Sequence, residues 1–321
     1  MSAEQPSLDK AFPENQTRRA QNPGAEKWVG RKIEVLDKGF VYLVDFMGSD
    51  QAIEQAARVS YGMGTRSVSA TEGLIRYLMR HRHTSPFEMA EMKFHAKMPI
   101  SVARQWVRHR TANVNEYSAR YSILQDEFYI PEHSEVSSQS VLNRQGRGES
   151  VNFDYAEEVR KKMEQSARND YEFYSYLLND DGGGNQADIE RPMLARELAR
   201  NVLPVSVYTE WYWKIDLHNL LHFLSLRMDE HAQWEIRQYA DAISEITRDA
   251  FPMTWKAFED FRLNSISIHG PEKETLVKIF ASGGISFSEE EIREIAISKG
   301  LVNKGELKEF TEKLASLGLI K

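Results

Sequence analysis

Residues 91–98, EMKFHAKM, alternate between polar and apolar side chains without interruption. The apolar members of this segment are Met92, Phe94, Ala96 and Met98. Successive side chains of a strand point to opposite faces of the sheet, so the pattern predicts a strand with one buried and one solvated face. Pro99 follows directly and suits the first turn of a helix. In that helix the expected apolar stripe consists of Val102, Ala103, Trp106 and Val107.

The rest of the chain mixes strands and helices without a regular βαβ rhythm. Further strands are expected at residues 126–131 and 210–216, and residues 32–46 are expected to form a strand or a hairpin with Lys38 and Gly39 at the turn. Helices are expected at 71–80, 154–178, about 191–203, 217–237 and 239–251, and a loop at 134–149. This order predicts an α+β fold, with an antiparallel sheet flanked by helices, rather than a doubly wound fold.

The chain divides into three regions by composition. Residues 1–30 are rich in Gln, Asn, Pro and charge, which predicts a flexible N-terminal arm. Residues 31–263 are expected to form the main domain, and 264–321 a small C-terminal helical appendage. Within the appendage, Ser288 and Glu291 have the spacing of a capping box, which predicts the start of a helix.

Composition excludes several classes of chemistry. The sequence has no Cys, so disulfides, thiolate metal sites, iron–sulfur clusters and a cysteine nucleophile are all excluded. A formal net charge of -7 argues against general attraction to nucleic acid or anionic lipid. No run approaches the roughly 20 apolar residues of a membrane span, and the N-terminus does not resemble a secretory signal. We therefore expect a cytoplasmic protein without membrane or nucleic-acid partners.

The densest cationic feature is residues 108–120, RHRTANVNEYSAR. Four arginines and Glu116 give residues 102–121 a net charge of +3, against -7 for the whole chain. Arginine binds phosphate or carboxylate through two parallel hydrogen bonds and stays charged, so this reversal favours an anion pocket. The alternative is a solvated helix end, where arginines are also favourable. The short polar side chains that follow, Asn113, Asn115, Glu116 and Ser118, favour the pocket.

Other segments carry weaker signals. His81 and His83 could ligate a metal, but with no Cys and no carboxylate pattern a loop is the more ordinary interpretation. His218 and His222 have the spacing of a zinc protease helix, yet Asn219 stands where that chemistry needs Glu. Their helix is either core or one wall of a cofactor cavity. The pair Arg196 and Arg200 alone is more typical of a surface, and the glycines at 182–184 match no phosphate-binding motif.

Together these segments resemble one family. Arg108 to Ser118 fits the signature of Arg-His-Arg, seven residues and Ser that is found in flavin-dependent thymidylate synthases. AARVS at 56–60, HRHTSPFE at 81–88 and LHFLSLRMDEHAQWEIR at 221–237 occur in the order of that family. The resemblance covers about residues 32–261 and leaves both ends outside it.

The resemblance implies methylation of dUMP to dTMP. Methylene-tetrahydrofolate would supply the carbon, NADPH the reducing equivalents and FAD the redox cofactor. Members of the family are homotetramers whose active sites combine several subunits. One independent feature agrees, because the other class of thymidylate synthase activates uracil with a cysteine and this chain has none.

The resemblance also implies roles for individual residues. Arg227 is expected to be catalytic, by polarising the pyrimidine ring. The expected dUMP-binding residues are Gln105, Arg108, Glu116, Ser118, Arg120, Arg200 and Arg227. The expected FAD-binding residues are Ser60, His83, Ser85, Arg108, His109, Arg110, Glu116, Asp216, His218, His222 and His231. Departures from the family pattern are Met89, Asn113, Asp216 and His218, and they affect the rim of the flavin site.

Two other functions compete with this one. The Arg-His-Arg cluster could serve a non-catalytic nucleotide- or RNA-binding protein, which the net charge of -7 disfavours. The same scaffold could also carry a flavoprotein of another reaction class. A flavin spectrum and formation of dTMP would separate the three.

Overall fold

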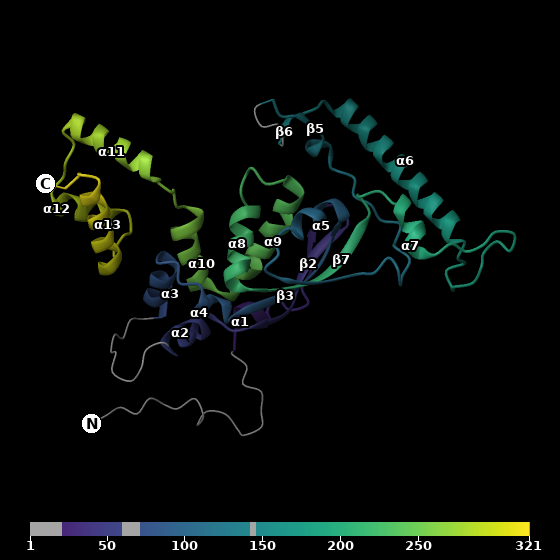
Figure 1. Cartoon of the computed structure of the whole chain (residues 1–321), viewed down its shortest axis with the longest axis horizontal. Coiled ribbons are helices and arrows are strands. Elements are labelled where there is room, and N and C mark those ends of the chain that lie inside the picture. The colour runs from purple at the N-terminus through teal and green to yellow at the C-terminus, as the bar shows by residue number, and fades with distance from the viewer. Residues whose placement is uncertain (1–20, 60–70, 142–145, 321) are drawn as a thin grey trace, which may run out of the picture. The chain divides into compact units, whose positions relative to one another are not determined.

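The computed structural model describes residues 21–59, 71–141 and 146–320. The chain divides into two compact units, Met1–Glu259 and Asp260–Lys321, which are described separately (Figure 1). A π-helical turn, η4 (Glu259–Leu263), lies at the boundary. Within the described residues, no helix combines the length and the apolar character needed to cross a bilayer.

A five-stranded antiparallel sheet forms the centre of the first unit, with strand order β1-β2-β3-β7-β4. Its strands are β1 (Ile33–Val35), β2 (Gly39–Met47), β3 (Glu91–Pro99), β4 (Asn113–Glu116) and β7 (Tyr208–Asp216). A separate two-stranded antiparallel sheet consists of β5 (Ser137–Gln139) and β6 (Arg147–Ser150). The predicted α+β class with an antiparallel sheet is therefore confirmed.

Helices surround the sheet and fill the second unit. Those of the first unit are α1 (Pro23–Glu26), α2 (Asp50–Val59), α3 (Thr71–Arg80), α4 (Ser85–Glu88), α5 (Ile100–Trp106), α6 (Phe153–Leu178), α7 (Arg196–Ala199), α8 (Leu217–Arg227), α9 (Trp234–Ala250) and α10 (Pro252–Phe258). The described part of the first unit also contains the short 3₁₀ turns η2 (His133–Glu135) and η3 (Arg200–Val202). The second unit contains α11 (Gly270–Gly283), α12 (Glu289–Ser298) and α13 (Lys304–Ser316), and the capping box of Ser288 and Glu291 begins α12 as predicted.

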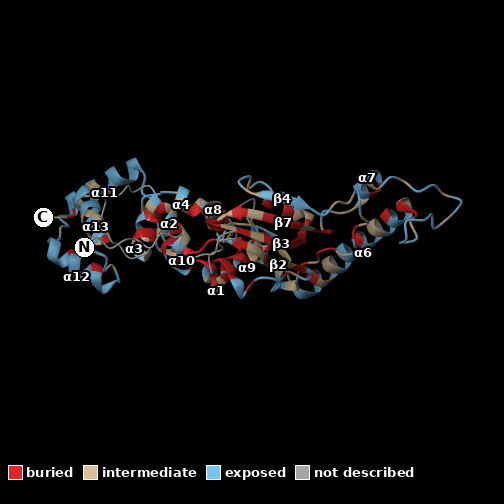
Figure 2. Ribbon diagram, turned by 90° about the horizontal axis from the view of Figure 1, so that it is seen from below, coloured by how far each residue is buried: buried red, intermediate tan, exposed pale blue. Residues whose placement is uncertain are grey.

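One face of the sheet carries the core. The four apolar side chains of β3 are fully buried, and Trp211, Trp213 and Ile215 of β7 lie beside them. Helices α5, α8 and α9 pack on this face, and buried residues concentrate there (Figure 2). The alternation of residues 91–98 thus identified the buried face correctly. The opposite face carries His95, whose ring nitrogens lie 2.7 Å from the Tyr42 hydroxyl and 2.8 Å from the Glu210 carboxylate.

Several elements match the sequence expectations and others do not. The hairpin β1–β2, strand β7 and helices α3 and α6 are confirmed. The strand predicted at 126–131 is reduced to a single bridge between Phe128 and Val207. The loop predicted at 134–149 instead contains η2 and the β5–β6 pair, because Ser137 and Gln139 pair with residues of β6. Val107 is 49% exposed and lies outside the apolar stripe of α5.

Two predicted helices are shorter than expected, for reasons visible in their hydrogen bonds. The helix expected at about 191–203 is reduced to α7 and η3, because the Arg191 carbonyl accepts from the Asn179 side chain at 2.6 Å. The Leu194 amide donates to Leu177 of α6 in the same region. The helix expected over 217–237 breaks after Arg227, because the Asp229 side chain accepts the His231 amide at 2.8 Å.

Asp50 links α2 to α10 in the interior of the first unit. It is 3% exposed, and its carboxylate accepts the Met253 amide at 2.9 Å, the Thr254 amide at 3.1 Å and the Thr254 hydroxyl at 2.6 Å. Burial raises the pKa of Asp50 in spite of these bonds. The side chain therefore caps the first turn of α10 from a distant part of the chain.

Replacing Asp50 with Ala is expected to lower the free energy of unfolding by about 2–3 kcal/mol, since it leaves buried donors of α10 unpaired. Asp50→Asn keeps one acceptor oxygen and avoids a buried charge, so its loss should be smaller. Urea unfolding followed by circular dichroism measures both. Equal stability of the Ala variant and the wild type would contradict this role.

Candidate active site

Helix α5 presents the first group of predicted site residues. Trp106, its last residue, is fully buried and its ring lies 5.1 Å from Trp213 and 5.2 Å from Phe223, measured between centroids. This packing fixes the end of the helix against β7 and α8. The His109 amide continues the turn by donating to the Trp106 carbonyl at 2.9 Å. The Arg-His-Arg segment therefore projects from a rigid point.

His109 lies against α8. Its ring centroid is 5.6 Å from that of His222 and 5.5 Å from that of Phe223. Burial lowers the pKa of His109, and the nearby His222 and Arg227 lower it further. The imidazole is therefore neutral at pH 7, since even its ordinary pKa lies near 6.5. The structure thus brings together His109, His222 and Arg227, three predicted site residues from two distant segments.

Asp216 begins α8 as its N-cap. Its carboxylate accepts the Asn219 amide at 2.9 Å and the Asn219 side chain at 2.7 Å. A hollow of about 350 Å³ opens beside it, lined in part by Arg110, Asn113 and Lys214. This position departs from the family pattern, and the capping bonds give Asp216 a structural role as well.

The segment around α4 lies beside the same helix. Helix α4 packs against α2 and α8, and the Leu217 amide at the start of α8 donates to the Ala90 carbonyl at 2.8 Å. His83 and Ser85 are exposed here, with the His83 ring 5.8 Å from Tyr77. The predicted residue Ser60 lies outside the described residues. In the described ranges no group of three histidines or carboxylates is placed to hold a metal ion.

A second group of predicted residues lies along β4 and the segment after it. Glu116 accepts the Thr209 hydroxyl at 2.8 Å, and the Ser118 hydroxyl accepts the Arg120 amide at 3.3 Å. The Arg120 guanidinium pairs with Glu197 of α7 at 3.2 Å, one helical turn before Arg200 in η3. Arg200 is exposed, and η3 packs mainly against α6 and α7.

Within one chain the two groups stay apart. Across the described residues, no hydrogen bond, ion pair or ring contact joins Glu116, Ser118, Arg120 or Arg200 to the group around Arg227. Arg108 and His218 also lie at the first group without a side-chain hydrogen bond inside the described chain. In the described part of one chain, the two groups are thus not bonded to each other.

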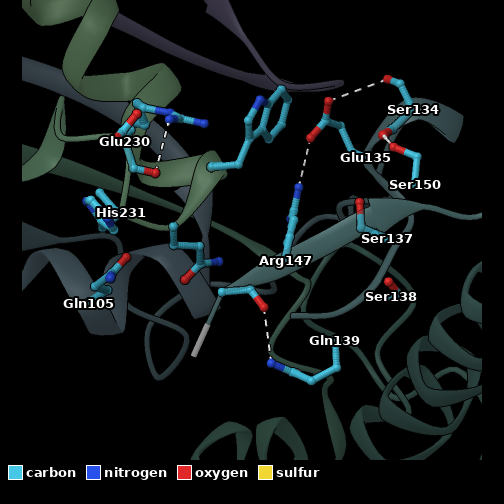
Figure 3. A pocket seen from close by; sticks show the side chains of 15 residues that line it. Gln105, Ser134, Glu135, Ser137, Ser138, Gln139, Arg147, Ser150, Glu230 and His231 are labelled. Atoms are coloured by element: carbon cyan, nitrogen blue, oxygen red, sulfur yellow. Dashed lines mark hydrogen bonds and ion pairs between the residues drawn. The ribbon is translucent and has the colours of Figure 1, made fainter. Parts of the chain in front are cut away.

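A pocket of about 840 Å³ adjoins the first group (Figure 3). Gln105 and His231, both predicted site residues, lie on one side of it, and Ser137, Gln139 and Arg147 of the β5–β6 sheet lie on the other. Sequence reasoning missed Arg147, Trp234 and Arg237 in this pocket. It read 134–149 as a loop, and nothing in the local pattern indicates that Arg147 reaches α9.

Unpartnered polar atoms test whether these residues fit a bound ligand. Four buried side-chain atoms in the described chain lack a hydrogen-bond partner, on Gln105, Trp106, Trp211 and Arg227. Two of them, Gln105 Oε1 and Arg227 Nε, belong to the predicted dUMP set. Buried polar groups are rarely left unpaired, so each of these two atoms is a candidate for a hydrogen bond to a bound ligand. A pyrimidine ring offers both donors and acceptors to such atoms, and the arginines of the Arg-His-Arg segment suit an anionic flavin cofactor.

Comparisons with known proteins agree with this geometry. The family model described as thymidylate synthase complementing protein matches residues 42–253. A flavin-dependent thymidylate synthase from Ruegeria pomeroyi is 51% identical over 270 residues, or 84% of this chain and 87% of the relative. Another, from Gluconobacter oxydans, is 56% identical over 236 residues, which are 74% of this chain and 75% of the relative. This chain belongs to the flavin-dependent thymidylate synthase family.

Solved structures extend the comparison. A UMP/dUMP methylase, PolB from Streptomyces cacaoi, bound with 5-Br dUMP, matches with a TM-score of 0.61 and 34% identity, over 73% of this chain and 100% of that chain. The structure of the same protein bound with 5-Br UMP matches with a TM-score of 0.62 and 36% sequence identity. The protein is thus an enzyme of the flavin-dependent thymidylate synthase family, while the roles of its individual site residues stay predictions.

Two further departures from the pattern of flavin-dependent thymidylate synthases lie at exposed positions. Met89, the C-cap of α4, is 55% exposed. Asn113 is exposed at the start of β4 and lines the hollow beside Asp216. Neither residue belongs to the contact between the half-buried His109 and α8.

Proposed function

We propose that this protein methylates dUMP to dTMP, with methylene-tetrahydrofolate as carbon donor and FAD reduced by NADPH. Membership in the family supports this reaction, as does the likeness to a dUMP methylase. The observation that carries the proposal is Arg227, whose buried Nε has no hydrogen-bond partner in the described residues and whose charge lowers the pKa of His109, in a chain without Cys.

Arg227 is the proposed catalytic residue. Uracil is a poor carbon nucleophile, and its activation without a thiol requires charge stabilisation on the ring. Burial lowers the pKa of Arg227, which is nevertheless an arginine and remains cationic at pH 7. A partly desolvated guanidinium stabilises charge developing on a pyrimidine carbonyl better than a hydrated one. Gln105 would accept a ring N–H and orient the base.

The flavin ring would supply the redox chemistry beside this residue. His109, His222 and Arg110 would hold it from the Arg-His-Arg segment and α8, with His83, Ser85, His218 and His231 along its edge. His109 donates to the Asn219 carbonyl and is neutral, so it binds without adding a further cation next to Arg227. Arg108 would contact both the flavin and the nucleotide.

The phosphate of dUMP would be bound by the second group. Ser118, Arg120 and Arg200 are hydrogen-bond donors at the surface, where arginine forks bind phosphate well. Because no hydrogen bond, ion pair or ring contact among the described residues joins these residues to the Arg227 group, we place both groups in one site between subunits of a homotetramer. A cytoplasmic location belongs to the same proposal, since the substrates are small molecules of nucleotide metabolism.

Purified protein incubated with dUMP, methylene-tetrahydrofolate, FAD and NADPH is expected to form dTMP, measured by mass spectrometry. NADPH oxidation should depend on dUMP. Oxidation without dTMP would indicate a flavoprotein of another reaction class. Steeply salt-dependent RNA binding without dTMP formation would instead favour the non-catalytic function.

A further inference from the structure

The side chain of Arg147 links the β5–β6 sheet to α9. Arg147 of β6 forms ion pairs with two carboxylates, Glu135 of η2 at 2.9 Å and Glu235 of α9. Its guanidinium also lies 5.6 Å from the Trp234 ring. Figure 3 shows Arg147 extending toward Glu135, on the side of the pocket opposite Gln105 and His231. The width of the pocket therefore depends on how β6 is held.

Glu235 is the buried member of its ion pair with Arg147. Its side chain is 5% exposed, compared with 34% for Arg147. The carboxylate also accepts the Tyr129 hydroxyl at 3.2 Å and the Gln233 side chain at 2.9 Å. Burial and Glu235 itself raise the pKa of Tyr129, so its hydroxyl stays protonated and donates. Glu235 is thus fully paired, and Arg147 is its only cationic partner in the described chain.

Arg147 lines the same pocket as Gln105, one of the proposed base-binding residues. Glu235 lies in the first turn of α9, four residues after His231, and the same pocket contains Gln105 with its unpartnered Oε1. Ion pairs that are buried at one end and charge-assisted hold a geometry firmly, unlike exposed pairs. Loss of the Arg147 side chain would remove the ion pair that holds β6 against α9.

We propose that Arg147 is a positioning residue for dUMP: its pairing with Glu235 and Glu135 holds β6 at the distance from Gln105 that the nucleotide requires. The inference rests on the proposed function. It concerns the free energy of binding rather than the chemical step, because Arg147 acts through the pocket wall and is not placed against the reacting ring.

The test is steady-state kinetics of Arg147→Met and Arg147→Lys. Arg147→Met is expected to raise the KM for dUMP about tenfold, equivalent to about 1.4 kcal/mol, while kcat and the KM for NADPH change by less than about twofold. Arg147→Lys keeps the charge and should recover part of the loss. Arg168→Met, which breaks an exposed pair with Glu164 on α6, is the matched control and should leave the KM for dUMP unchanged.

The double variant Arg147→Met/Glu235→Gln separates positioning from stability. Arg147→Met alone leaves a buried carboxylate without its cation and lowers the thermal midpoint. The second substitution removes that charge, so the midpoint should recover while the KM for dUMP stays high. A normal KM in Arg147→Met, or recovery of KM together with stability, would overturn the inference. Failure of the wild type to form dTMP would instead refute the proposed function.

Discussion

Arg227→Ala is expected to lower kcat for dTMP formation by about 100- to 1,000-fold, the usual cost of removing one donor that stabilises charge in a transition state. The fold should survive the change. Arg227 Nε has no hydrogen-bond partner in the described chain, so its removal leaves no buried group of the protein newly unpaired. A loss of turnover without a loss of stability is thus the specific expectation.

The measurement is single-turnover formation of dTMP with flavin and substrates at saturation, together with a thermal melt. Arg227→Lys retains the charge without the planar fork and should recover only a small part of the rate. Arg248→Ala, on the outer part of α9, is the matched control and should behave as the wild type. Normal dTMP formation by Arg227→Ala would refute its catalytic role.

Mixing two inactive variants is expected to restore activity. Arg120→Ala should impair binding of the dUMP phosphate, and Arg227→Ala should impair the chemical step. If each site takes Arg120 from one subunit and Arg227 from another, randomly mixed tetramers contain intact sites in about one quarter of positions. Co-refolded or co-expressed variants should therefore form dTMP at about one quarter of the wild-type rate.

The control for this experiment is each variant mixed with itself under the same conditions. Arg120 pairs with an exposed Glu197, so its loss costs little stability and should not obscure the result. Persistent inactivity of mixed tetramers, with mixing verified by native mass spectrometry, would show that both arginines act within one subunit.

Local patterns were sufficient to predict β2, β3 and β7 of the central sheet, but not β4. The alternation of residues 91–98 identified both β3 and its buried face, because the period of a strand is a local property. The same holds for α3, whose predicted bounds of 71–80 are those observed. Strand order and the position of β4 beside β7 depend on contacts between distant segments, and no local pattern contains them.

Elements whose ends depend on side chains were predicted less well. The Asn179 side chain donates a hydrogen bond to the Arg191 carbonyl, so the region before α7 has no helix despite its composition. Asp229 ends the helical run after Arg227 through a local turn. These competing hydrogen bonds are invisible to hydrophobic periodicity.

The candidate site shows the same division. The spacing of Arg108 to Ser118 was specific enough to identify the family, and the structure brings His109 to His222 and Arg227, whose roles stay predictions. Arg147 was missed, because its importance comes from a buried partner, Glu235, that is 88 residues away. Only the folded structure brings Arg147 and Glu235 together.

An absorption spectrum of the purified protein, titrated with dUMP, tests the central claim most directly. A polarising arginine beside a flavin requires that both ligands bind in one site, so the account predicts a yellow protein whose flavin bands shift saturably as dUMP is added. A colourless protein that takes up no FAD, or flavin bands that dUMP leaves unchanged, would contradict it.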